Sequence, residues 1–387
     1  MAPLNKRREL IRLSRSCVGE SEISAVSKVL YDGYLGMGSV VSEFEDQLVA
    51  FFNRPVVCVS SGTAALHLAL QAIGVGEGDE VLVPSITYVA TYQAISATGA
   101  KPVSCDIKKF DLCLDSQDVS QRITPRTKAI VPMHYAGSAS YINEIYKIAE
   151  NYGLRVVEDA AHAFGSHLNG RRVGSFGDIV CFSFDGIKNI TCGEGGCVVT
   201  DDLAILEGIS DNRLLGVRGD SKKRVAGSRS WDFDVSSQGW RYHMSNVMAA
   251  IGIQQLAKCE TFFRKRQELA KLYDSYLAKT KNLELLKLDY EEVVPHIYVV
   301  ILASHIERNK LRDILLEYNI ETGIHYKPNH ALTYYRSTNL EKLEVTEMLS
   351  HRLLSLPLHP MLGGDDVAYV CDVLTHTLDE LGKHFPH

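Results

Sequence analysis

Short hydrophobic runs alternate with longer amphipathic patterns between residues 56 and 200. The runs are rich in β-branched residues and read as strands, and each amphipathic pattern reads as a helix that ends at a glycine. Alternating strands and helices are typical of a mostly parallel sheet covered on both faces. We therefore expect an α/β protein, with strands at residues 56–59, 80–83, 102–105, 129–131, 154–157 and 179–182 and helices at residues 63–73, 88–98 and 141–152.

The pattern changes after residue 245. Residues 246–277 form a long and almost uninterrupted helical pattern, which predicts a bridging helix. A strand at 297–301 and helices at 308–318 and 342–354 then predict a smaller C-terminal α+β domain. We expect two domains, 1–245 and 246–387. The polar residues 227–238 predict a surface loop, mobile or ordered by a partner.

Composition narrows the function. The 387 residues include 41 Lys and Arg against 47 Asp and Glu, a formal charge of −6, with no long basic run. This balance gives no electrostatic footprint for nucleic acid, so we expect small-molecule or protein partners. The longest apolar stretches are too short to span a bilayer, and the first residues lack the apolar region of a signal peptide. We expect a soluble, cytoplasmic protein.

The cysteine and histidine patterns do not predict a metal site. The nine cysteines are scattered and never form a CxxC pair, and the fourteen histidines include no HExxH motif. Cys192 and Cys197 are five residues apart without a second pair of ligands. Buried free thiols of a reducing compartment are the better interpretation.

Three segments carry candidate chemistry, and the first is a helix start. Residues 60–65 (SSGTAA) follow an apolar strand and open a helix, so free backbone N–H groups and the helix dipole face outward together. That arrangement binds phosphate, although the same residues also form an ordinary helix N-cap. The segment is neither a Walker loop nor GxGxxG.

The second segment is a strand end and the third is a loop with a lysine. Asp159, in residues 158–162 (EDAAH), ends a buried strand where ligands of open α/β sheets bind. Its carboxylate can cap a helix, bind a metal or pair with a protonated ring nitrogen. Lys188 follows the strand 179–182 and precedes the glycine-rich residues 193–196, and a lysine shielded from water becomes a nucleophilic amine.

Together the three segments match the needs of pyridoxal phosphate (PLP). This cofactor requires a phosphate anchor, an anion at the pyridinium nitrogen and an amine for a Schiff base. The phosphate segment, Asp159 and Lys188 supply these in turn. Tyr88, at a strand-to-helix junction, can lay its ring on the cofactor or belong to the core.

Five ordered motifs resemble the DegT-type nucleotide-sugar aminotransferases, a family of fold-type-I PLP enzymes. The likeness covers about residues 20–335 and rests on SSGTAALHLAL (60–70), GDEVLVPS (78–85), EDAAH (158–162), GDIVCFSF with Lys188-Asn189 (177–189) and GEGG (193–196). The resemblance implies a large PLP-binding domain with a mostly parallel central sheet of the aspartate aminotransferase type, plus the smaller C-terminal domain.

The resemblance also implies roles for individual residues. Lys188 would form the internal aldimine and carry protons, Asp159 would pair with the pyridine nitrogen, and His162 would reach the 3-oxygen of the cofactor. Tyr88 would stack on the ring. The remaining cofactor-binding residues would hold the phosphate: Gly62, Thr63, Ala64 and Ser183.

Members of this family are dimers that share their active sites. Arg241 lies where many of them have an asparagine that contacts the cofactor phosphate of the other subunit, and a cation there can also meet a phosphate. Two further groups of residues would bind the nucleotide-linked sugar. The first group is Met37 and Gly38. The second is His325, Tyr326 and Lys327, which offer two donors and a cation suited to a diphosphate.

The leading hypothesis is a transaminase. It would take the amino group of L-glutamate and pass it to a keto group, expected at the 4-position, of a nucleotide-linked deoxy sugar for a cell-surface glycan.

An alternative is a PLP-dependent sugar dehydratase or deoxygenase on the same scaffold. The best-known such relatives replace the lysine by histidine or need closely grouped cysteines, so Lys188 and the scattered cysteines disfavour it. Another alternative is a non-catalytic regulatory homologue, which the intact Lys188 and Asp159 disfavour.

Overall fold

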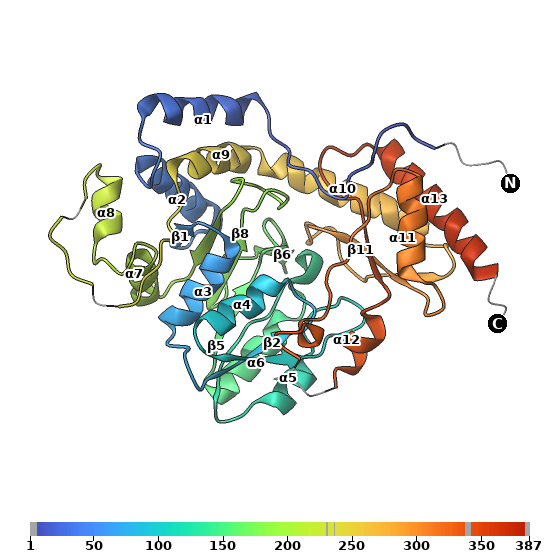
Figure 1. Cartoon of the computed structure of the whole chain (residues 1–387), viewed down its shortest axis with the longest axis horizontal. Coiled ribbons are helices and arrows are strands. Elements are labelled where there is room, and N and C mark those ends of the chain that lie inside the picture. The colour runs from blue at the N-terminus through green and yellow to red at the C-terminus, as the bar shows by residue number, and fades with distance from the viewer. Residues whose placement is uncertain (1–5, 230, 236, 337–341, 384–387) are drawn as a thin grey trace.

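A seven-stranded sheet forms the centre of the larger part of the molecule (Figure 1). The computed structural model describes residues 6–229, 231–235, 237–336 and 342–383. The strand order is β1-β9-β8-β5-β4-β2-β3, and every neighbouring pair is parallel except those that β9 makes with β1 and β8. The strands are β1 (Val56–Val59), β2 (Glu80–Pro84), β3 (Lys101–Cys105), β4 (Thr127–Ile130), β5 (Arg155–Asp159), β8 (Ile179–Ser183) and β9 (Gly196–Val199).

Both faces of this sheet are covered, as the sequence predicts. Alternate residues of one strand enter different clusters, so Val57 and Val59 pack with α3 and α4 while Val56 and Cys58 pack with α2. The predicted α/β class with a mostly parallel sheet is confirmed, and the six predicted strands are present within two residues. The helices around the sheet are α2 (Ser39–Phe52), α3 (Gly62–Ala72), α4 (Val89–Ala97), α5 (Ser116–Arg122), α6 (Ile142–Tyr152) and α7 (Leu203–Asn212), and the short α8 (Asp220–Val225) packs on α2 and α7.

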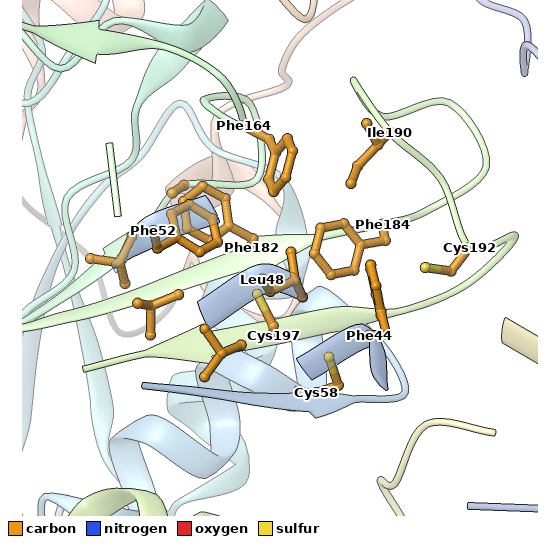
Figure 2. Packing of buried hydrophobic residues seen from close by; sticks show 14 of the residues in the cluster. Phe44, Leu48, Phe52, Cys58, Phe164, Phe182, Phe184, Ile190, Cys192 and Cys197 are labelled. Carbon is orange, nitrogen blue, oxygen red and sulfur yellow. The ribbon is translucent and has the colours of Figure 1, made fainter. Parts of the chain in front are cut away.

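Lys188 lies in the loop that follows β8, and an aromatic core packs around the end of this strand (Figure 2). Phe52 stacks on Phe182 of β8 with ring centroids 4.9 Å apart, and Phe164 packs against both at right angles. Ile190, two residues after the lysine, is buried in the same cluster. Because protein cores are close-packed, this anchoring fixes where the loop leaves the sheet.

The segment 246–277 is two helices and not the single helix that the sequence predicts. α9 (Asn246–Ala257) ends at Lys258, whose φ of −116° and ψ of 9° break the helix before α10 (Cys259–Leu277). α9 packs on α1 (Glu20–Asp32). α10 continues to the C-terminal part of the chain (Figure 1).

The C-terminal part is an antiparallel sheet with helices, as the α+β prediction requires. Its sheet has the order β10 (Leu283–Leu285), β11 (Tyr298–Leu302), β12 (Leu353–Leu356). The predicted helix 342–354 is wrong in extent, because α12 (Glu344–Leu349) is short and Leu353 and Leu354 pair with β11 as part of β12. The other helices are α11 (Arg308–Glu317) and α13 (Gly364–Lys383).

Smaller elements complete the chain. The hairpin β6 (His167–Leu168) and β7 (Arg171–Arg172) and two 3₁₀ turns (Tyr135–Gly137 and Asn329–Ala331) connect the larger ones. The predicted loop 227–238 carries the exposed Trp231 and Phe233, and its residues 230 and 236 lie outside the described part. In the described residues, every helix is too short or too polar to cross a membrane.

Candidate active site

A cavity of about 470 Å³ opens at the carboxyl ends of β5 and β8. Ligands of α/β sheets bind at this edge, and the volume is in the range of small-molecule sites. The structure brings nine of the predicted site residues to its wall: Gly62, Thr63, Tyr88, Asp159, His162, Ser183, Lys188, His325 and Tyr326.

Lys188 extends its amine into this cavity. The loop is held by the backbone bond from Lys188 N–H to the carbonyl of Asp185 (3.0 Å) and by Asn189, whose side chain donates to the carbonyl of Phe164 (2.9 Å). Burial lowers the pKa of Lys188 to about 8, against the opposing fields of Asp159 and Asp185. Since only the uncharged amine is nucleophilic, this environment prepares Lys188 for attack on a carbonyl near neutral pH.

Asp159 is buried at the end of β5, and two hydrogen bonds orient its carboxylate. Thr91 of α4 donates from its hydroxyl to Oδ2 at 2.7 Å, and the N–H of Ala161 donates to Oδ1 at 3.2 Å. Thr91 in turn contacts the hydroxyl of Thr87 at 2.9 Å. The carboxylate lines the cavity in a fixed position and can pair with a protonated ring nitrogen.

The start of α3 forms the other end of the cavity. Ser61 is the N-cap, and its hydroxyl accepts from the N–H of Ala64 at 3.1 Å. The N–H groups of Gly62 and Thr63 have no acceptor within the helix, as in every first helical turn. A Cβ on Gly62 would come within 2.8 Å of the Cβ of Ser183, so glycine allows this close approach to β8. The arrangement suits an anion.

The buried His162 and His296, the half-buried His325 and a tyrosine form the wall beside Lys188. His162 bonds the hydroxyl of Tyr326 through Nε2 at 2.8 Å, and its ring lies 4.5 Å from the ring of His296. His325 contacts the hydroxyl of Ser355 at 2.7 Å. Burial lowers the pKa of all three histidines, and the charge of Lys188 is the next largest cause. The pKa of His325 falls to about 4, and the pKa values of His162 and His296 fall well below the ordinary range. All three rings are therefore neutral near pH 7.

Tyr88 is placed at the mouth of the cavity. It is the N-cap of α4, and 58% of the residue is exposed. Its ring centroid lies 5.7 Å from that of Tyr326 at an angle of 45°. The ring therefore has a free face on which a planar ligand can lie.

Five predicted site residues do not line this cavity. Ala64 is buried, and its N–H already donates a hydrogen bond to the hydroxyl of Ser61. Met37 is fully buried among the aromatic core, and Gly38 caps α2. Arg241 is exposed outside the cavity. Lys327 is exposed and lines a neighbouring cavity of about 540 Å³.

Sequence reasoning missed several residues that line or support the site. Asp185, Glu194 and His296 line the cavity, and Thr91 orients Asp159. Asp185 and Glu194 lie in the motif segments on either side of Lys188, and this proximity is the sequence signal for them. His296 is an isolated histidine before a strand and carries no motif signal.

Comparison with known proteins identifies the same family over nearly the whole chain. The model of the DegT/DnrJ/EryC1/StrS aminotransferase family matches residues 16–375. A curated relative, the uncharacterized protein MJ1066 of Methanocaldococcus jannaschii, is 37% identical over 377 residues, which cover 95% of this chain and 97% of that protein.

Solved structures agree with this match. The aminotransferase TlmJ from Streptoalloteichus hindustanus is 31% identical with a TM-score of 0.89, covering 96% of this chain and 100% of its own. Spr1654 from Streptococcus pneumoniae, in its PLP form, is 29% identical with a TM-score of 0.89, covering 96% and 99%. The sugar aminotransferase CalS13 from Micromonospora echinospora is 29% identical with a TM-score of 0.87, covering 95% and 100%. This chain therefore belongs to the DegT/DnrJ/EryC1/StrS aminotransferase family.

Proposed function

We propose that this chain is a PLP-dependent aminotransferase that moves the amino group of L-glutamate to the 4-keto group of a nucleotide-linked deoxy sugar. One observation carries the proposal: the amine of Lys188 and the carboxylate of Asp159 face a single cavity whose wall includes the start of α3. The similarity to Spr1654, solved with PLP, and to CalS13, named a sugar aminotransferase, supports the cofactor and the substrate class.

The residues present fit this cofactor. His162 is buried, yet its Nδ1 has no hydrogen-bond partner among the described residues. Buried polar atoms are normally paired, so an orphaned nitrogen that borders a cavity indicates a ligand oxygen there. Gly62 and Thr63 line the cavity, and their N–H groups in the first turn of α3 have no acceptor within the helix, so they can donate to a phosphate.

Each of these residues has a role that follows from its position. When bound, PLP supplies an electron sink for the substrate carbon. Lys188 binds the cofactor through its amine and moves the proton at that carbon, while Asp159 keeps the pyridine nitrogen protonated. His162, neutral and held by Tyr326, orients the 3-oxygen. Tyr88 covers one face of the ring.

The nucleotide-sugar site extends from His325 and Tyr326 toward Lys327. His325 and Tyr326 border the cofactor cavity, and Lys327 borders the second cavity together with Arg308 and His330. These cationic and donor groups suit a diphosphate. The Met37 side chain is buried in the core, so we assign it no contact with the substrate that binds in its own protomer.

We propose a homodimer that shares its active sites. Two exposed apolar surfaces support it: the outer face of α1, where Tyr31 is 92% exposed beside Ile23 and Leu30, and the 227–238 loop, where Trp231 is 86% exposed. Arg241 then meets the phosphate held by the other subunit. Analytical ultracentrifugation tests this, and a monomer at micromolar concentration would contradict it.

The domain division and location complete the proposal. The boundary between domains 1–245 and 246–387 falls at Ser245, the N-cap of α9. The cytoplasm suits the nine free cysteines, because it keeps thiols reduced, and the aminated sugar would feed a cell-surface glycan.

The test is amino transfer by purified protein. Protein loaded with PLP should lose its visible colour when glutamate is added. A screen of UDP-, dTDP- and GDP-linked keto sugars, read by product mass and NMR, should then give an amino sugar, and Lys188→Ala should give none. Full turnover by Lys188→Ala, or a wild-type protein that takes up no PLP, would overturn the proposal.

A further inference from the structure

His296 is the side chain that Lys188 contacts in the cavity. Its Nε2 lies 3.4 Å from the Nζ of Lys188, and the residue is 4% exposed. No ion pair of Lys188 is found in the part of the chain that the structure describes. A buried amine needs a hydrogen-bond partner, and this imidazole is in place to serve as one.

Hydrogen bonds hold the backbone that carries this imidazole, while the ring Nδ1 has no hydrogen-bond partner among the described residues. His296 lies two residues before the start of β11, and the buried Arg266 of α10 donates to its carbonyl at 3.1 Å and to that of Pro295 at 3.4 Å. The ring packs against His162 at 4.5 Å. The C-terminal part of the chain thereby supplies a fixed group to a lysine on the large sheet.

The imidazole is also neutral. Burial lowers the pKa of His296 well below the ordinary range. The charges of Lys188 and Arg266 act in the same direction, and so do the neighbouring His162 and His325. A neutral imidazole carries a lone pair on one nitrogen and a proton on the other. Its Nε2 can therefore accept a hydrogen bond from the Lys188 amine.

We propose that His296 is a positioning residue that accepts a hydrogen bond from Lys188 and aims the amine at the carbonyl carbon it must attack. The inference rests on the proposed function, because that attack is the loading of PLP. In this step the Lys188 nitrogen forms a bond to the aldehyde carbon, and the aldehyde oxygen leaves as water with both amine protons. His296 holds the nitrogen during the attack and is unchanged at the end.

Two amide variants separate positioning from packing. His296→Gln places its amide near the position of the imidazole Nε2, whereas His296→Asn is too short to reach it. We expect PLP uptake by the apoprotein, followed by visible absorbance, to slow about tenfold in His296→Asn and to stay within about threefold of wild type in His296→Gln. The matched control is His376→Asn on α13, remote from the site, which should load like wild type.

A second readout needs no cofactor. Competitive acetylation of the apoprotein with acetic anhydride, read by peptide mass, reports the reactivity of each lysine. Lys188 should be less reactive in His296→Asn than in His296→Gln, while thermal unfolding of the two variants stays alike. Equal uptake and equal Lys188 reactivity in both variants would overturn the inference. If wild type itself does not load at Lys188, the proposed function fails as well, so the two failures are distinguishable.

Discussion

The hydroxyl of Thr91 donates a 2.7 Å hydrogen bond to the Oδ2 of Asp159, although the two residues are 68 positions apart. Both are buried, one at the first turn of α4 and the other at the end of β5. The bond connects a helix to a strand end and fixes the carboxylate that faces the cavity.

Replacing Thr91 by valine should weaken PLP binding. The substitution keeps the shape of the side chain but removes the donor, and a hydrogen bond to a charged group is worth about 1.5–3 kcal/mol, or roughly tenfold to a hundredfold in affinity. Thr91→Ser keeps the hydroxyl and should bind nearly as well as wild type. Equilibrium titration of the apoprotein with PLP measures both, and equal affinities for valine and serine would argue against this role.

Gly62→Ala should disturb the phosphate end of the cavity. Its new Cβ would lie 2.8 Å from the Cβ of Ser183, and such overpacking costs about 1–3 kcal/mol. We expect about a tenfold or greater loss of PLP affinity. The control is Gly208→Ala in α7, where a Cβ meets nothing within 4 Å and should leave affinity unchanged. Wild-type affinity in Gly62→Ala would refute the assignment.

Uptake of PLP should depend on pH through Lys188. Its pKa is lowered to about 8, so the protonated amine dominates below that value and the nucleophilic form above it. The rate should therefore rise with pH and level off above about pH 8. The neighbouring His325, with a pKa of about 4, stays neutral over this range. Stopped-flow absorbance measures the profile, and a midpoint near the ordinary lysine value of about 10.4 would contradict it.

Glu158, the neighbour of Asp159, should matter for stability and not for chemistry. Successive residues of a strand face opposite sides, and the fully buried Glu158 bonds His134 at 2.6 Å and the hydroxyl of Tyr146 at 2.5 Å. Glu158→Ala should lower the free energy of unfolding by about 3 kcal/mol, measured by chemical denaturation. The exposed Glu150→Ala on α6 should change it by less than about 0.5 kcal/mol. Equal stabilities for the two variants would be inconsistent with this role.

The sheet could be predicted from the sequence because its strands are short, β-branched and buried on both faces. The break at Lys258 could not, since no glycine or proline marks it. The Nζ of Lys258 instead lies 2.5 Å from the carboxylate of Glu22, a contact 236 positions away along the chain. Likewise Leu353 and Leu354 fit a helical pattern, and pairing with β11 makes them a strand.

From the residues alone, candidate site residues could be predicted only where they follow a strand end or open a helix, whereas His325 and Tyr326 were expected from the family resemblance. Lys188, Asp159 and Gly62 lie at such points, and the fold brings them to one cavity. Thr91 reaches the same place from the first turn of α4, and His296 reaches it from the segment before β11 of the other sheet. Nothing local in the sequence distinguishes them, because their importance comes from contacts across the fold.

The most direct test of the account is the location of the cofactor on the chain. Holoenzyme treated with borohydride, digested and analysed by peptide mass should carry one PLP group on Lys188, and glutamate added before the borohydride should prevent the labelling. Labelling at another lysine, or no labelling of a protein that has been incubated with PLP, would contradict the account.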